Sequence, residues 1–238
     1  MGYSHYLWRP HELDRERWRE WVGDVRQILT NLPAQVSQTY FPLDRPPVTV
    51  QAPLIVAGPL GSGQPELNDE FVSFNGGGYV EVDGHLNRLW CETFHLDRDL
   101  GGEGFTGPDE RGWYFECCKT RQMPYDLVVT ASLIRLAHRF PEGVEVSSDG
   151  WPEDWQAGLD LCRNVFGHAE LPFPVGPVAP TAGPDRRSEL LAKRDSGRLA
   201  PHEVGELREL LDRDLEADAA RDSISEPTRQ PDQPDCAP

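Results

Sequence analysis

Residues 112–150 decide the fold, and they read GWYFECCKTRQMPYDLVVTASLIRLAHRFPEGVEVSSDG. Residues 113–119 (WYFECCK) predict a β-strand, whose two faces would carry Trp113, Phe115, Cys117 and Lys119 on one side and Tyr114, Glu116 and Cys118 on the other; the pattern does not decide which face is inward. Pro124 follows, and residues 125–140 are apolar on almost every side, which predicts a buried helix. After a turn, residues 144–147 predict a short strand. The stretch therefore indicates a strand, a central buried helix and a second strand.

The N-terminal part predicts one more strand and one more helix. Residues 3–8 (YSHYLW) are short and aromatic, and Pro10 ends the strand they predict. Residues 12–32 place tryptophan and aliphatic side chains at helical spacing with charges on the other side. Pro33 ends this amphipathic helix, which we expect to pack one face against a sheet.

Short strands and turns fill the middle of the chain. The proline-rich residues 33–53 predict a long surface connection with a short strand at 48–50. Further strands are expected at 54–57, 71–74 and 89–96, with a loop at 75–78. A glycine-rich turn joins 89–96 to 113–119, which we expect to be its antiparallel neighbour. A last helix carries Trp155, Leu159, Cys162 and Phe166 and ends at Gly167.

This order of elements predicts an α+β fold, a mainly antiparallel sheet flanked by three helices, with a C-terminal helical tail. The α+β domain is expected at residues 1–169. Residues 170–186 are a proline-rich linker, because they read ELPFPVGPVAPTAGPDR. Residues 187–218 predict an acidic helical hairpin. Residues 219–238 contain few apolar side chains and are expected to be disordered.

Composition narrows the classes of partner. The chain has 40 Asp and Glu against 23 Lys and Arg, a net charge of -17. No nucleic-acid partner is therefore expected, because such affinity depends on clustered Lys and Arg, and an anionic membrane surface is disfavoured. Five cysteines without a CxxC pair indicate neither a disulfide framework nor a zinc site. No signal peptide or membrane-spanning run is recognisable, so a cytoplasmic location is expected.

Several short motifs resemble those of one family. They are GYSHYLW at 2–8, FNG at 74–76, ETF at 92–94, CKTRQMPYDLVV at 118–129 and SSDG at 147–150. Together they resemble a family of small bacterial and phage proteins with a GYTHYW-like start and an FCKT...PYD segment. The resemblance covers residues 2–167, and the chain departs from the pattern at Leu7 and Cys117. It implies one domain and a phage-related context, and it implies no activity.

Polar residues stand at many positions where core residues are expected. Glu92 is the clearest, because alternation over 89–96 places it on one face with Trp90 and Phe94. A carboxylate there needs a partner. The full set of candidate ligand-binding residues is Tyr3, His5, Asn75, Glu92, Cys118, Lys119, Tyr125, Asp126 and Asp149. Nearly all lie in strands or at strand ends, so they are expected to converge on one cleft.

The leading hypothesis is a small-molecule or nucleotide-binding protein with this polar cleft. Two other classes stay open. An acidic interaction or inhibitor factor would bind a phage or host protein through its surface or its C-terminal helices. A Cys/His-type hydrolase would use Cys118 as nucleophile, His5 or His95 as base and Glu92 or Asp126 as the acid that orients the base. Lys119 would lower the thiol pKa.

Two further interpretations of these residues are a metal site and a set of purely structural roles. A metal site would have to use His5, Glu92, His95 and Asp149, but no local ligand spacing supports it, so no metal is expected, and no cofactor is assigned. In a purely structural reading Asp149 caps the following helix, Asp126 favours its own helix through the dipole, and Lys119 pairs with Glu92. His5 and Tyr3 would then satisfy their polar atoms in an edge strand.

Overall fold

A computed structural model of the chain describes residues 3–40, 46–101, 107–167, 171 and 193–194. Within these ranges the helices are α1 (Arg15–Thr30), α2 (Asp126–Arg139) and α3 (Gln156–Phe166), with 3₁₀ turns η1 (Pro59–Gly61) and η2 (Pro152–Trp155). The strands are β1 (Ser4–Arg9), β2 (Gln35–Tyr40), β3 (Val48–Pro53), β4 (Val56–Ala57), β5 (Glu66–Leu67), β6 (Phe71–Gly76), β7 (Tyr79–Val82), β8 (His85–Arg88), β9 (Phe94–Asp97), β10 (Tyr114–Lys119) and β11 (Glu145–Ser148). The strand pairs are antiparallel, and the α+β class is confirmed. The predicted linker, hairpin and tail lie outside the described residues, apart from 171 and 193–194.

Strand β1 is the centre of a three-stranded sheet with β10 on one side and β11 on the other. His5 lies opposite Cys118 in β10 and opposite Ser148 in β11. Alternation along β1 buries His5, Leu7 and Arg9 on the inner face. The first predicted strand is therefore confirmed, but it is central and not at an edge.

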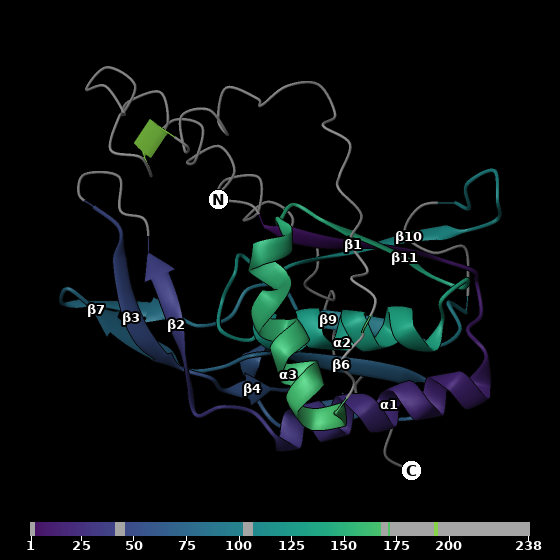
Figure 1. Cartoon of the computed structure of the whole chain (residues 1–238), viewed down its shortest axis with the longest axis horizontal. Coiled ribbons are helices and arrows are strands. Elements are labelled where there is room, and N and C mark those ends of the chain that lie inside the picture. The colour runs from purple at the N-terminus through teal and green to yellow at the C-terminus, as the bar shows by residue number, and fades with distance from the viewer. Residues whose placement is uncertain (1–2, 41–45, 102–106, 168–170, 172–192, 195–238) are drawn as a thin grey trace, which may run out of the picture. The chain divides into compact units, whose positions relative to one another are not determined.

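Helix α2 is the central buried helix that the sequence predicts. Ten of its residues are buried, and Figure 1 shows it running below the three-stranded sheet, with α1 on its other side. The ring N–H of Trp21 in α1 donates to the Ser132 carbonyl of α2 over 2.9 Å. Helix α3 also packs on α2 and ends at Gly167, whose φ of 69° is the left-handed value that favours glycine.

Strand β6 organises the other main sheet. It pairs with β9 on one side and with β4 and β5 on the other. The loop predicted from Asn75 onward is wrong for its first two residues, since Asn75 and Gly76 end the strand. A side chain on Gly76 would overlap the Leu89 carbonyl and the Tyr125 ring. This glycine therefore serves close packing and not an unusual backbone angle.

The strand predicted at 89–96 is wrong over its first half. Only Phe94–Asp97 is a strand, and it pairs with β6 and not with the strand at 113–119. The preceding backbone bonds in several directions, from the Leu89 N–H to Gly78 and from the Glu92 N–H to Lys119. Because these partners do not lie along one strand, alternation does not apply there, and Glu92 is exposed rather than in the core.

Two hairpins occur in segments for which the sequence predicted only a surface connection with a short strand at 48–50, or no regular structure; that short strand is part of β3. Within 33–53, β2 and β3 form an antiparallel pair with polar contacts across it, including Thr39 to Thr49 at 2.9 Å between hydroxyl oxygens. Residues 79–88 form the β7–β8 hairpin. Polar cross-strand pairs stabilise exposed ribbons without producing the apolar alternation by which strands are recognised.

Candidate functional site

Polar side chains in or beside four elements, β1, β10, α2 and β11, come together at one end of the three-stranded sheet. We call Tyr3, His5, Thr120, Asp126 and Ser148 the polar corner. The Nε2 atom of His5 lies 2.7 Å from Oδ1 of Asp126, and the Thr120 hydroxyl donates to the same oxygen. A carboxylate oxygen accepts, so we assign the His5 proton to Nε2. Asp126 thus fastens the start of α2 to β1 and to the end of β10.

The polar corner is closed to solvent. Only 2% of His5 and 6% of Tyr3 is exposed, and the two rings meet edge to face with centroids 5.2 Å apart. The Nδ1 atom of His5 and the Tyr3 hydroxyl are buried without a hydrogen-bond partner among the described residues. Ser148 lies close to Tyr3, but the two hydroxyls do not meet hydrogen-bond geometry. The expectation that both side chains satisfy their polar atoms is therefore wrong.

Tyr125 and Glu92 fasten the segment before β9 to the same end of the sheet. The Tyr125 hydroxyl donates to the Glu92 carbonyl over 2.6 Å, and the Glu92 carboxylate accepts the backbone N–H of Lys119 over 2.8 Å. Glu92 thus contacts Lys119 at its main-chain N–H. Asn75 lies apart from the polar corner and holds the same segment, donating to the Cys91 carbonyl over 3.0 Å.

Asp149 does not cap the next helix, so that expectation is wrong. Its carboxylate accepts the Ser4 N–H over 2.9 Å and the Tyr6 hydroxyl over 2.8 Å. Asp154 accepts the Trp151 N–H instead, over 2.8 Å, at the start of η2. Pro152 explains the difference, because the helical turn begins there, three residues after Asp149. Asp149 is exposed and bonds to Ser4 at the start of β1, and Ser4 lies opposite Lys119 in β10.

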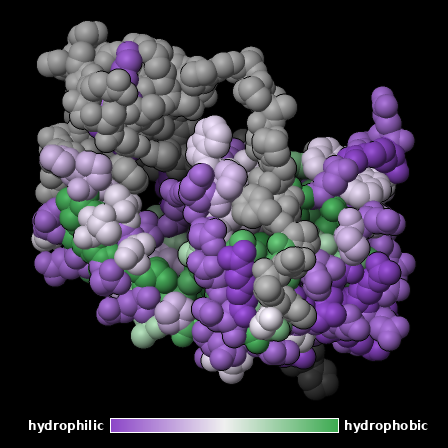
Figure 2. Space-filling model, viewed as in Figure 1, coloured by the Kyte–Doolittle hydropathy of each residue, from purple (hydrophilic) through white to green (hydrophobic). Residues whose placement is uncertain are grey.

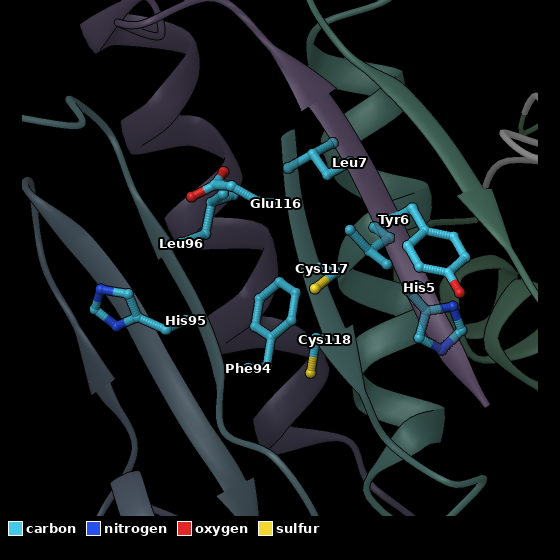
Figure 3. A pocket seen from close by; sticks show the side chains of 10 residues that line it. His5, Tyr6, Leu7, Phe94, His95, Leu96, Glu116, Cys117 and Cys118 are labelled. Atoms are coloured by element: carbon cyan, nitrogen blue, oxygen red, sulfur yellow. The ribbon is translucent and has the colours of Figure 1, made fainter. Parts of the chain in front are cut away.

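Cys118 faces inward, which settles the orientation of strand β10. It borders a cavity of about 20 Å³ between the two main sheets, which is room for about one water molecule. Figure 3 shows Cys118 and Phe94 pointing into this space while His95 points away from it. Burial, with the charges of Glu92 and Asp126, raises the pKa of the Cys118 thiol well above its ordinary value. A raised pKa disfavours the thiolate that a nucleophile needs.

The described residues contain no group of three or more side chains suited to hold a metal ion. His95 contacts Asp97, with 3.2 Å between Nε2 and Oδ2, and both side chains are on the sheet of β6. His5 belongs to the other sheet and bonds to Asp126. The residues weighed for a metal site therefore have separate partners.

The outward side of the three-stranded sheet holds residues that the sequence reasoning missed. We call this side, with Ser4, Tyr6, Trp8, Phe115, Cys117 and Lys119, the outer face. The Tyr6 and Phe115 rings stack with centroids 5.9 Å apart, and the Trp8 and Phe115 rings lie 5.0 Å apart. All three rings are half-buried. The alternation in YSHYLW contained this signal, because its inward and outward positions both carry rings.

Stability should fall at high pH because of the buried tyrosines. Burial raises the pKa of Tyr125 well above 10.0, and burial together with Asp126 raises that of Tyr3. The unfolded chain then loses these protons first, so their contribution is complete below about pH 10 and is lost as pH rises further. We expect about 1.4 kcal/mol less unfolding free energy per pH unit for each tyrosine. Urea unfolding at several pH values measures this slope.

Tyr125→Phe should reduce that alkaline slope, and Tyr79→Phe, at an exposed position, is the matched control. An unchanged slope in Tyr125→Phe would contradict the assignment of the effect to burial of this phenol.

Comparisons with known proteins identify no relative of this chain. No family model, no curated protein and no solved structure matches the chain. Among the described residues, no helix has the length and apolar character needed to cross a lipid bilayer. The interpretation of the site therefore depends on its geometry.

Proposed function

We propose that this chain is a small-molecule-binding protein that takes a nucleoside or mononucleotide on the outer face. The half-exposed aromatic row on β1 and β10 carries this proposal. Exposed antiparallel sheets that present aromatic rings bind bases by stacking, because every base has a π-face. The ligand ring would lie against Tyr6, Trp8 and Phe115.

Polar groups stand at one end of the aromatic row. Lys119 is opposite Ser4 on the outer face, and the Asp149 carboxylate reaches Ser4 and Tyr6. A lysine ammonium suits a phosphate, and a carboxylate accepts from sugar hydroxyls. The buried polar corner lies directly beneath and fixes the positions of these groups by holding the three strands to α2. The candidate residues Lys119 and Asp149 would thus contact the ligand, whereas His5 and Asp126 would act as positioning residues.

The net charge favours a single nucleotide over a polynucleotide. At -17 the chain repels a polyanion, whose binding depends on many phosphate contacts. A mononucleotide needs one such contact. The closed polar corner and the raised thiol pKa of Cys118 give less support to the hydrolase alternative.

Phe115→Ala is expected to weaken nucleotide binding by about 5- to 150-fold, because stacking of one base on an aromatic ring contributes about 1–3 kcal/mol. Isothermal titration with the four ribonucleoside monophosphates and their nucleosides measures this. Tyr79→Ala removes an exposed ring from the β7–β8 hairpin, which is not part of the outer face, and should leave the affinity unchanged. Absence of binding by every nucleoside and nucleotide, or equal binding by Phe115→Ala, would refute the proposal.

A further inference from the structure

A second surface, away from the outer face, exposes large apolar side chains. We call Ile55, Leu60, Tyr79 and Leu86 the apolar patch. Their exposed fractions are 45%, 87%, 54% and 69%, and they are four of the five large hydrophobic side chains exposed in the described part of the chain. In Figure 2 hydrophobic residues reach the surface on the side where Figure 1 places β2, β3 and β7. Isolated exposed apolar residues are ordinary, but gathered ones mark binding surfaces.

Contacts across the glycine turns make the apolar patch continuous. The Ile55 side chain covers Gly77 and Gly78, which lead into Tyr79. The Tyr79 ring meets the Trp90 ring edge to face at 4.9 Å between centroids.

The other two members of the apolar patch, Leu60 and Leu86, are connected to this contact between Tyr79 and Trp90. The Trp90 ring lies beside Gly61, the neighbour of Leu60. Leu86 in β8 pairs with Glu81 in β7, and Tyr79 in β7 pairs with Arg88 in β8, so Leu86 and Tyr79 share one face of the hairpin.

Leu60 is held in an unfavourable backbone conformation. Its φ of 61° and ψ of 20° are left-handed, which costs a leucine of the order of 1 kcal/mol. The Leu60 N–H donates to the Thr93 hydroxyl over 3.3 Å. A glycine would fit this backbone without strain, and a polar residue would suit the exposure. Folding alone therefore does not explain an exposed leucine at this position, whereas contact of its side chain with a partner does.

We propose that the apolar patch docks a basic amphipathic helix of another protein, with Leu60 entering between the apolar side chains of that helix. The charge of the chain selects this partner over a second copy, since two chains of -17 repel each other. Glu81 and Arg88 are both exposed on the same face of the hairpin as Tyr79, so the preference for a basic partner comes from the net charge of the chain and not from this face. Leucine at helical spacing on one side and lysine on the other would complement this surface.

The probe is a synthetic helix of leucine and lysine at amphipathic spacing, labelled for fluorescence anisotropy, with a matched peptide in which glutamate replaces lysine. We expect the lysine peptide to bind the full chain at least about 10-fold more tightly than the glutamate peptide. Leu60→Asp should weaken its binding about 10-fold or more, because one buried leucine contributes about 1.5–3 kcal/mol to docking. Trp151→Ser, which removes the fifth exposed apolar side chain, should have no effect.

Leu60→Gly separates docking from folding. It relieves the left-handed strain, so it should raise the midpoint of thermal unfolding while weakening peptide binding. Equal binding of the lysine peptide by wild type and Leu60→Asp would reduce the effect to general attraction between charges and overturn the proposal. Absence of lysine-peptide binding would also overturn it. So would self-association by sedimentation equilibrium that Leu60→Asp abolishes, because a second copy would then be the occupant.

Discussion

An Asp24→Ala variant is expected to lose about 3–5 kcal/mol of unfolding free energy, because it leaves a buried cation without its counter-charge. Asp24 in α1 is 3% exposed. Its Oδ2 atom accepts from Arg135 over 2.8 Å and from Arg139 over 2.8 Å, both in α2. Arg135 is 1% exposed and its guanidinium lies 4.2 Å from the centroid of the Phe166 ring in α3. The three helices therefore meet at this charge.

Urea unfolding of the wild type and of two comparison variants checks this expectation. Asp69→Asn breaks an exposed pair with Arg19, and we expect little change from it because solvent screens such pairs. A double variant, Asp24→Leu with Arg135→Leu, should recover part of the loss, since replacing both buried partners by apolar groups is often neutral. Arg139 can keep its contact with Glu20. A loss in Asp24→Ala no greater than in Asp69→Asn would contradict the assignment.

Periodicity predicted the buried parts of this fold because burial leaves a pattern. Helices α1 and α2 were predicted because Trp18, Trp21 and Ile28, and then almost every residue of α2, lie against other elements. Strand β3 was predicted only at 48–50, and β2, β7 and β8 were not predicted, because partly exposed ribbons need no apolar alternation. The buried ion pair of Asp24 and Arg135 was also missed, since their sequence separation hides the contact.

The candidate residues could be placed at strand ends, but their partners could not. Sequence reasoning expected His5, Cys118, Asp126 and Asp149 near one another, and strand pairing places them at one end of a sheet. Their bonding depends on register, which the sequence pattern does not specify outside a clear alternation. Glu92 shows the consequence. An alternation assumed to continue through 89–96 placed it in the core, whereas a change in backbone direction exposes it.

The second large effect is expected at the polar corner, where Asp126→Ala should cost about 3–5 kcal/mol of unfolding free energy. The substitution leaves the Nε2 proton of His5 and the Thr120 hydroxyl without their acceptor in a buried setting. Hydrogen bonds to a charged group contribute about 1.5–3 kcal/mol each, and unmatched buried donors add a desolvation cost. Tyr6→Phe removes one hydrogen bond to the exposed Asp149 and is the matched control, with an expected cost below about 1.5 kcal/mol.

A double-mutant cycle with His5→Phe decides whether the two residues act as a pair. Phenylalanine keeps a ring between Tyr3 and Trp155, whose centroids lie 5.2 and 5.0 Å from that of His5, and it removes both nitrogens. Coupled residues should give an interaction energy above about 1 kcal/mol by urea unfolding. Additivity within about 0.5 kcal/mol would show that each residue is stabilised by separate contacts. A coupled pair, in contrast, makes His5 and Asp126 the connection through which α2 fixes β1, and with it the position of Tyr6 and Ser4 on the outer face.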